Sequence, residues 1–167
     1  FTDWRRRRVL RNHRMDEALW PRLPFLPASP KLKDLTLLFL AEKQFTAVRG
    51  LVLTDAMRVS IAAQACLPIL NLPTEWYDGW VEIIVYPAQF MPDVEWEDEY
   101  GVVHVGKEPR AGEAWLHGPV ILSWEDMDDD YADGVNVAIH EFVHKIDMLN
   151  GDADGFPPLH PEMAREE

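Results

Sequence analysis

The fold is decided by one stretch of the sequence, Asp133-Gly-Val-Asn-Val-Ala-Ile-His-Glu-Phe-Val-His-Lys-Ile-Asp-Met-Leu-Asn-Gly151. Its pattern predicts a helix that begins near Asp133 and ends at Gly151. The helical period of about 3.6 residues gathers apolar side chains on one face, those of Val135, Ala138, Ile139, Phe142, Ile146 and Leu149. Polar side chains line up on another face, those of Asn136, His140, His144 and Asp147. We therefore expect a helix with one buried side and one side available for chemistry.

His140 and His144 have the spacing of a zinc site. Four residues apart, the two imidazoles lie one turn apart on the same side of a helix, where both can reach one Zn²⁺ at ~2.0–2.1 Å. Glu141 can act as the general base on a zinc-bound water, whose pKa the metal lowers toward ~7. A histidine taken alone is more often a core or surface residue, but burying two imidazoles and a carboxylate together is costly without a metal. The motif therefore predicts a zinc-dependent hydrolase, with a metallopeptidase as the leading interpretation.

The role of Asp147 and the third metal ligand are left open by the sequence. Asp147 is either a carboxylate that orients a ligand imidazole or an ordinary residue of the last turn. The metzincin pattern requires Gly and His where this chain has Asp147 and Asn150, which excludes that class. Prolines keep the following stretch irregular, so its candidate ligands are weak, namely His160, Glu162, Glu166 and Glu167. We expect the third ligand to lie beyond Glu167, in a site truncated at the C-terminus.

The remaining chain predicts an α+β domain with a small mixed sheet. An Arg-rich helical arm and a proline-rich connector, together residues 1–30, precede a domain that covers residues 31–167. Helices are expected at 31–48 and at 54–67, the second with Thr54 as its N-cap. Strands are expected at three β-branched stretches, 80–86, 101–105 and 119–124.

Two segments, 119–124 and 125–130, each allow two interpretations. The strand at 119–124 is either a core strand or an exposed edge that binds an extended peptide by strand addition. Acidic loops are expected at 93–99 and at 125–130. The second has aspartates that suggest calcium, but it lacks the ligand spacing of an EF-hand, which favours a solvated loop.

Charge and cysteine content limit the partners and the compartment. A net charge of −13 disfavours nucleic acid and anionic membranes as partners, because their phosphates would be repelled. Arg5 to Arg8 are not followed by the apolar segment of a secretion signal, so we expect a solvated basic stretch. No apolar run reaches the length of a membrane span. The single cysteine, Cys66, lies in an apolar run and is expected to be buried, which fits a reducing cytoplasm.

Further stretches have the order and spacing of one known family. They are Cys66-Leu-Pro-Ile-Leu-Asn-Leu72, Trp76-Tyr-Asp-Gly-Trp80, Ile84-Val-Tyr-Pro-Ala88, Glu95-Trp-Glu-Asp98 and Gly118-Pro-Val-Ile-Leu-Ser-Trp124. Together with His140-Glu-Phe-Val-His-Lys-Ile-Asp147 and Asn150-Gly-Asp152, they resemble the Mlc titration factor A family of bacterial zinc peptidases. The resemblance covers roughly residues 30 to 160.

This resemblance implies a gluzincin-like, zincin-type fold that is related in its core to the protease domain of anthrax lethal factor. It also implies that zinc is held by His140, His144 and a glutamate of a downstream helix, with a catalytic tyrosine downstream as well. Both residues would fall outside this chain, which should then bind zinc weakly. The family binds the glucose-responsive repressor Mlc, which implies a cytoplasmic role in sugar-uptake regulation.

Two functions follow, with a third that is weaker. The first is a peptidase, with an aminopeptidase among its variants, in which Glu141 is the base. The second is a protein that sequesters a repressor and uses zinc for its fold, a function that the acidic loops would support by complementing a basic DNA-reading surface. The third is a zinc hydrolase that acts on substrates other than peptides.

Overall fold

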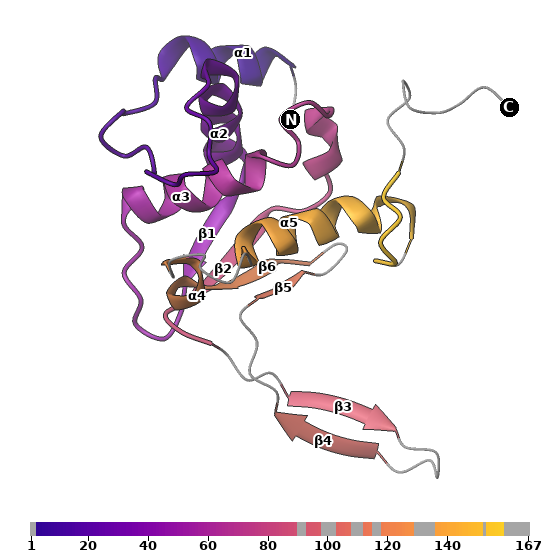
Figure 1. The fold of residues 1–167 in the computed structure, drawn as a ribbon. Coiled ribbons are helices and arrows are strands. Elements are labelled where there is room, and N and C mark those ends of the chain that lie inside the picture. Colours follow the sequence, from indigo (N-terminus) through magenta and orange to yellow (C-terminus); the bar gives the residue numbers. More distant parts are fainter. Residues whose placement is uncertain are drawn as a thin grey trace, which may run out of the picture.

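The computed structural model describes residues 3–89, 93–97, 103–107, 112–114, 118–128, 136–151 and 153–158. Its helices lie against a four-stranded sheet, and a separate two-stranded hairpin extends from the sheet (Figure 1). The helices are α1 (Asp3–Asn12), α2 (Pro30–Glu42), α3 (Asp55–Cys66), α4 (Trp124–Asp128) and α5 (Val137–Asp147), with short 3₁₀ helices η1 (Thr74–Tyr77) and η2 (Met148–Asn150). The strands are β1 (Gln44–Ala47), β2 (Glu82–Tyr86), β3 (Asp93–Glu97), β4 (Val103–Lys107), β5 (Gly112–Ala114) and β6 (Val120–Ser123).

The four-stranded sheet is mixed, as the sequence predicts. Its strand order is β1-β2-β6-β5, in which β1, β2 and β6 run parallel and β5 runs antiparallel to β6. The register pairs Ile83 with Val120 and Val85 with Leu122, so these four fully buried side chains lie on one face of the sheet. They form one core with α3 and α5, which cover this face. The sheet therefore supports α5 through this core.

The strand at 119–124 is a core strand, and its interpretation as an exposed edge is wrong. β6 lies between β2 and β5, so both of its edges are hydrogen-bonded. Within the described residues, the edge of the sheet near α5 is β5, a three-residue strand that the sequence analysis did not predict. Three residues give too short an alternation to be recognised.

The first predicted core helix, 31–48, is too long. α2 ends at Glu42, and residues 44–47 form β1, which pairs with β2 at the other edge of the sheet. Lys43 adopts an extended conformation, and its ammonium group donates hydrogen bonds to the carbonyl oxygens of Tyr77 and Trp80 at 2.6 and 2.7 Å. These distant partners end the helix. The second predicted helix is confirmed, with Thr54 capping the Met57 amide of α3.

The acidic segments are more regular than predicted. Residues 93–97 form β3, which pairs antiparallel with β4, and the predicted strand at 101–105 is shifted to Val103–Lys107. Residues 124–128 form α4, so the solvated loop predicted there is wrong for this part. Asp126 accepts a hydrogen bond from Gln89 at 3.0 Å, and Asp129 and Asp130 lie outside the described residues.

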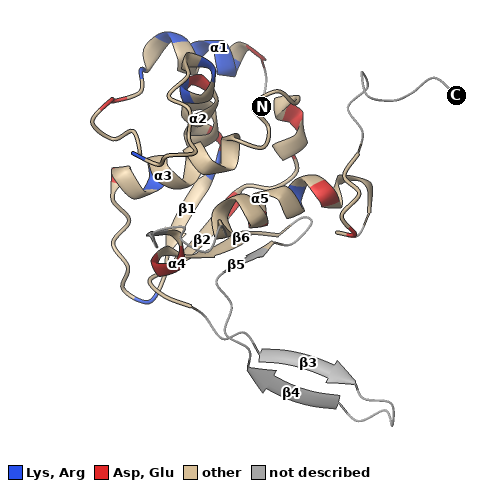
Figure 2. Ribbon diagram, viewed as in Figure 1, with Lys and Arg blue, Asp and Glu red and all other residues tan. Residues whose placement is uncertain are grey.

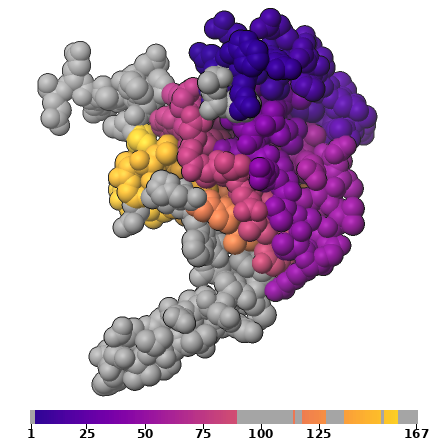
Figure 3. Space-filling view, turned by 180° about the vertical axis from the view of Figure 1, so that it is seen from behind, coloured from indigo at the N-terminus to yellow at the C-terminus, as the bar shows by residue number. Residues whose placement is uncertain are grey.

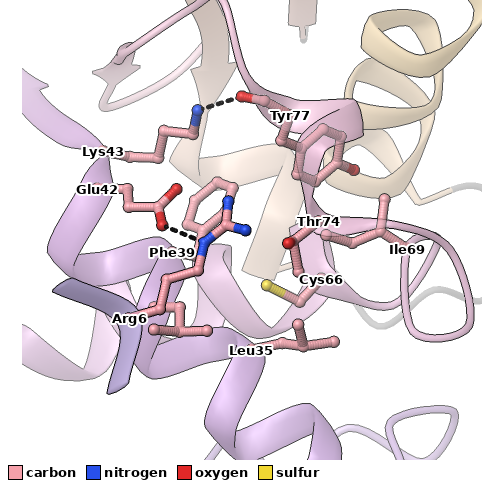
Figure 4. A pocket seen from close by; sticks show the side chains of 10 residues that line it. Arg6, Leu35, Phe39, Glu42, Lys43, Cys66, Ile69, Thr74 and Tyr77 are labelled. Carbon is pink, nitrogen blue, oxygen red and sulfur yellow. Dashed lines mark hydrogen bonds and ion pairs between the residues drawn. The ribbon is translucent and has the colours of Figure 1, made fainter. Parts of the chain in front are cut away.

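The N-terminal arm is helical only from Asp3 to Asn12, and it packs against α2. Arg6 is the link, because its guanidinium group contacts Glu42 of α2 at 3.3 Å (Figure 4). The same group contacts Glu75 of η1 at 2.6 Å. The cavity beneath Arg6 is also lined by Cys66, which is buried as predicted. Burial raises the pKa of this thiol, so it is unreactive. Every helix within the described residues is too short or too polar to cross a bilayer.

Candidate metal centre

The helix that carries the histidine motif begins at Val137, four residues after the predicted start at Asp133. Asn136 is its N-cap, and the side-chain oxygen of Asn136 accepts a hydrogen bond from the Ile139 amide at 2.7 Å. Residues 129–135, including the predicted start at Asp133, lie outside the described residues. At the other end α5 stops at Asp147, and η2 continues the chain to Gly151. Leu149, predicted to be on the apolar face, is 41% exposed on this 3₁₀ turn.

Three contacts fix α5 to the rest of the fold. Asn136 donates a hydrogen bond to the Gln64 side chain of α3 at 2.7 Å. Phe142, within the motif itself, is fully buried in a cluster of four aromatic rings with centroids 5.7 to 6.1 Å apart, those of Phe39, Tyr77, Trp80 and Phe142. Lys145 donates a hydrogen bond to the Gly118 carbonyl at 2.7 Å, just before β6. The helix is thus held at its start, its middle and its last turn.

The imidazoles of His140 and His144 converge. Their Nε2 atoms lie 2.9 Å apart, and the rings stand edge to face with an interplanar angle of 89°. His140 is exposed and His144 is half-buried. Partial burial and the nearby His140 lower the pKa of His144, while Asp147 opposes this shift. This lowered pKa favours the neutral imidazole, the form in which a histidine binds a metal.

Glu141 directly follows His140, Asp147 comes one turn after His144, and both acidic residues are buried. Asp147 accepts a hydrogen bond from the Gly155 amide at 2.8 Å through one oxygen, while its second oxygen is buried and has no hydrogen-bond partner among the described residues. Asp147 therefore holds the loop that follows the helix. Whether it also orients an imidazole remains a prediction.

An apolar groove of about 670 Å³ lies beside the second half of α5. Its floor includes Val143 and Ile146 of α5, and Trp76 stands on one side. The opposite side is the loop held by Asp147, in which Asn150 also donates a hydrogen bond to the Phe156 carbonyl at 2.9 Å. Val143 directly precedes His144 in the chain, but adjacent positions on a helix point about 100° apart, so the groove lies next to the face that carries the two histidines and not on it.

Comparison with known proteins places the chain in a family. The family model of the glucose-regulated metallo-peptidases M90 matches residues 1–167. The chain belongs to this M90 family. The M90 chain is 44% identical to Mlc titration factor A of Klebsiella pneumoniae (strain 342) over 132 residues, which are 78% of this chain and 50% of that protein. It is 47% identical to Mlc titration factor A of Salmonella gallinarum over 121 residues, 71% of this chain and 46% of that protein.

The M90 chain therefore spans about half the length of the curated relatives it matches. The resemblance to the Mlc titration factor A family is confirmed by these identities. Membership in a family of metallo-peptidases implies a metal ion, and the described residues of the M90 chain that could bind it are the two histidines of α5.

The histidine pair fits a zinc ion in its donor chemistry. Two nitrogens on one tetrahedral Zn²⁺ stand about 3.3 Å apart, and small rotations of the two rings would bring the observed 2.9 Å to that distance. The described residues of the M90 chain contain no group of three His, Cys, Asp or Glu side chains that could hold a metal. The weak candidates for a third ligand, His160, Glu162, Glu166 and Glu167, lie outside the described residues.

Sequence reasoning missed the buried polar residues that support the motif in the M90 chain. Gln64, Lys43 and Lys145 are all at most 8% exposed. The two ammonium groups flank the Trp80 ring, at 3.8 Å for Lys43 and 5.0 Å for Lys145. In the sequence, Lys145 follows His144 and has the pattern of a surface residue, and only the distant partners Gly118 and Trp80 reveal its role.

Proposed function

We propose that this chain supplies two ligands and the general base of a zinc-dependent peptidase. His140 and His144 are the ligands, and the observation that carries the proposal is the 2.9 Å separation of their Nε2 atoms on one side of α5. Imidazole ligands next to a carboxylate are the donor set that zinc hydrolases use. The name of the M90 family supports a metal and peptide-bond chemistry. We assign the third ligand to residues outside those described.

Each residue of the motif has a distinct role in this proposal. Bound zinc supplies a Lewis acid that lowers the pKa of water toward ~7. Glu141 takes the proton of the attacking water as general base and returns it to the leaving amine as general acid. Phe142 and Lys145 hold the helix in place, so that Glu141 and the two imidazoles keep a fixed spacing.

The peptide is expected to bind where the fold leaves backbone and apolar surface open beside α5. β5 pairs with β6 on one side only within the described residues, and it packs against α5. An extended peptide can therefore add to β5 as a further strand. It cannot add to residues 119–124, because both edges of β6 are already paired. The groove beside Val143 offers an adjacent place for an apolar side chain.

The decisive experiment is Glu141→Gln in the full-length protein. This variant should retain its zinc, measured by metal analysis, and should lose at least about 100-fold in kcat on a peptide substrate, since general-base catalysis contributes that much or more. Glu125→Gln, on the exposed side of α4, is the matched control and should keep full activity. Wild-type activity in Glu141→Gln would exclude Glu141 as the base.

A second candidate function is favoured by the relatives' printed name, Mlc titration factor A. We propose that the full-length protein also binds a repressor of the Mlc type in the cytoplasm, and that binding and catalysis are separable. Glu141→Gln should then bind the purified repressor with wild-type affinity in calorimetry. If repressor binding and peptidase activity disappeared together in this variant, the two functions would share the motif.

A further inference from the structure

The arginines of α1 are distributed unequally between the two sides of the helix. Arg6, Val9 and Leu10 face α2 and are at least half-buried. The opposite side is exposed and carries four side chains, which we call the basic face of α1, those of Trp4, Arg7, Arg8 and Arg11. At about 100° per residue these four positions fall on one contiguous side of the helix.

The printed side-chain contacts of Arg8 and Arg11 stay within α1, since Arg11 donates a hydrogen bond to the Arg7 carbonyl at 3.3 Å and Arg8 lies near Trp4. None of these three arginines forms an ion pair with a described residue, whereas Arg6 contacts Glu42, Glu75 and Asp78. Trp4 is 62% exposed, and the Arg8 guanidinium group lies 5.5 Å from the centroid of its ring. Packing within the described fold does not account for an exposed indole among arginines that have no carboxylate partner there.

Positive charge is concentrated in the N-terminal part of the chain. Residues 1–14 contain six arginines and one aspartate, a formal charge of +5, so the rest of the chain carries −18. Figure 2 shows basic residues concentrated on α1, while acidic residues are spread over the fold, including the start of α1, the segment between α1 and α2, and α4. Because the Debye length is about 8 Å at physiological salt, a surface that contacts the basic face is screened from the acidic groups that lie farther away. The overall charge of −13 therefore does not describe what α1 presents.

We propose that the basic face of α1 docks the protein on a bilayer that contains anionic lipids. In Figure 3, the N-terminal segment forms an outward bulge of the molecule, a convex shape that meets a plane and does not enclose a small ligand. Arginines at a membrane surface gain from anionic headgroups, and tryptophan prefers the headgroup region. Nucleic acid offers the same phosphates but gives no role to Trp4, and it would extend past α1 over the acidic remainder.

The test uses full-length protein and co-sedimentation with vesicles. Vesicles of phosphatidylcholine and phosphatidylglycerol should bind the protein, vesicles of phosphatidylcholine alone should not, and added salt should release it. The triple variant Arg7→Gln, Arg8→Gln, Arg11→Gln should bind about 100-fold more weakly, since each arginine near an anionic surface contributes about fivefold. Trp4→Ala should lower binding severalfold, with less effect from Trp4→Phe.

A matched control changes the net charge equally at other places. Arg22→Gln, Arg49→Gln, Arg58→Gln also removes three positive charges and should bind as wild type does. Each triple variant loses cation–π contacts, that of Arg8 in the first and those of Arg49 and Arg58 in the second, so both should unfold somewhat below the wild-type temperature in a single cooperative transition, which excludes misfolding. Absence of binding to anionic vesicles, equal loss in the two triple variants, or tighter binding to duplex DNA than to vesicles at equal phosphate would each overturn the proposal.

Discussion

Asn136 donates a hydrogen bond to Gln64 at 2.7 Å, so the residue that caps the histidine-bearing helix is itself held by α3. Gln64 is 1% exposed, and its loss leaves the half-buried amide donor of Asn136 without its partner. Gln64→Leu should therefore lower the free energy of unfolding by about 1–3 kcal/mol. Denaturant titration measures this change.

A double-mutant cycle tests whether the cap and the glutamine act together. Asn136→Ala alone should cost about 1 kcal/mol for the lost cap, and the double variant should cost less than the sum of the two single changes. Asn71→Ala, which removes only an exposed hydrogen bond from Lys31, should cost less than about 0.5 kcal/mol. Strict additivity in the cycle would argue against the coupling.

His140→Ala and His144→Ala should each weaken zinc binding by more than about 100-fold, because losing a direct ligand exceeds the cost of losing an outer partner. Competition with a chromophoric chelator measures the affinity. His13→Ala, on the exposed N-terminal arm, is the control and should bind zinc normally. Unchanged affinity in both motif variants would remove the pair from the metal site.

Lys43 and Lys145 should make the free energy of unfolding depend on pH in the alkaline range. Burial lowers the pKa of each ammonium group from 10.5 to about 8, opposed at Lys43 by Glu42 and reinforced at Lys145 by Lys43. Between these values the unfolded chain binds more protons than the folded one, so the free energy of unfolding should rise from about pH 8 to about pH 10.5. The upper limit is about 3 kcal/mol per lysine.

Urea unfolding across this pH range checks the sign. Lys145→Met should flatten the rise by roughly half, because one of two perturbed groups is gone. Lys31→Met, at an exposed position, should leave the slope unchanged. A free energy of unfolding that falls over the same interval would contradict the expected direction.

Asp147→Ala should free the loop that follows the helix. The variant loses the acceptor for the Gly155 amide, so hydrogen exchange at Gly155 should accelerate. Asp147→Asn retains an acceptor oxygen and should protect Gly155 nearly as the wild type does. If Asp147 also orients an imidazole, zinc affinity should fall about 10–100-fold in the alanine variant. Unchanged exchange in Asp147→Ala would mean that other contacts hold the loop.

The local features of the site could be predicted from sequence, and the distant ones could not. The spacing of His140 and His144 fixes their common side on any helix, and Phe142 follows from the apolar period. Gln64 accepts a hydrogen bond from Asn136, which lies 72 residues later in the chain. Lys43 contacts the helix only indirectly, through the ring of Trp80. No local sequence pattern encodes such distant partners. The sequence does not decide the role of Asp147, because its hydrogen-bond partner, the Gly155 amide, belongs to an irregular loop.

The predicted elements that differ from the structure also depend on distant partners. The helical period of α2 continues through Phe45, so only the pairing of Phe45 with Ile83 decides that residues 44–47 are a strand. The acidic residues of β3 suggested a loop, because the antiparallel partner β4 that stabilises this strand is not apparent from charge. β6 was recognised from its own residues, but its place inside the sheet depends on β5.

The parallel register of the sheet dictates when the histidine motif can form during synthesis. Gln44 pairs with Glu82 and Ile83 pairs with Val120, so each pairing waits for a partner almost forty residues later in the chain. A ribosome that stalls before Val120 would leave the apolar edge of β2 open to chaperones or to aggregation. The two imidazoles belong to the last described long helix, and they gain their fixed spacing only after this slow assembly is complete.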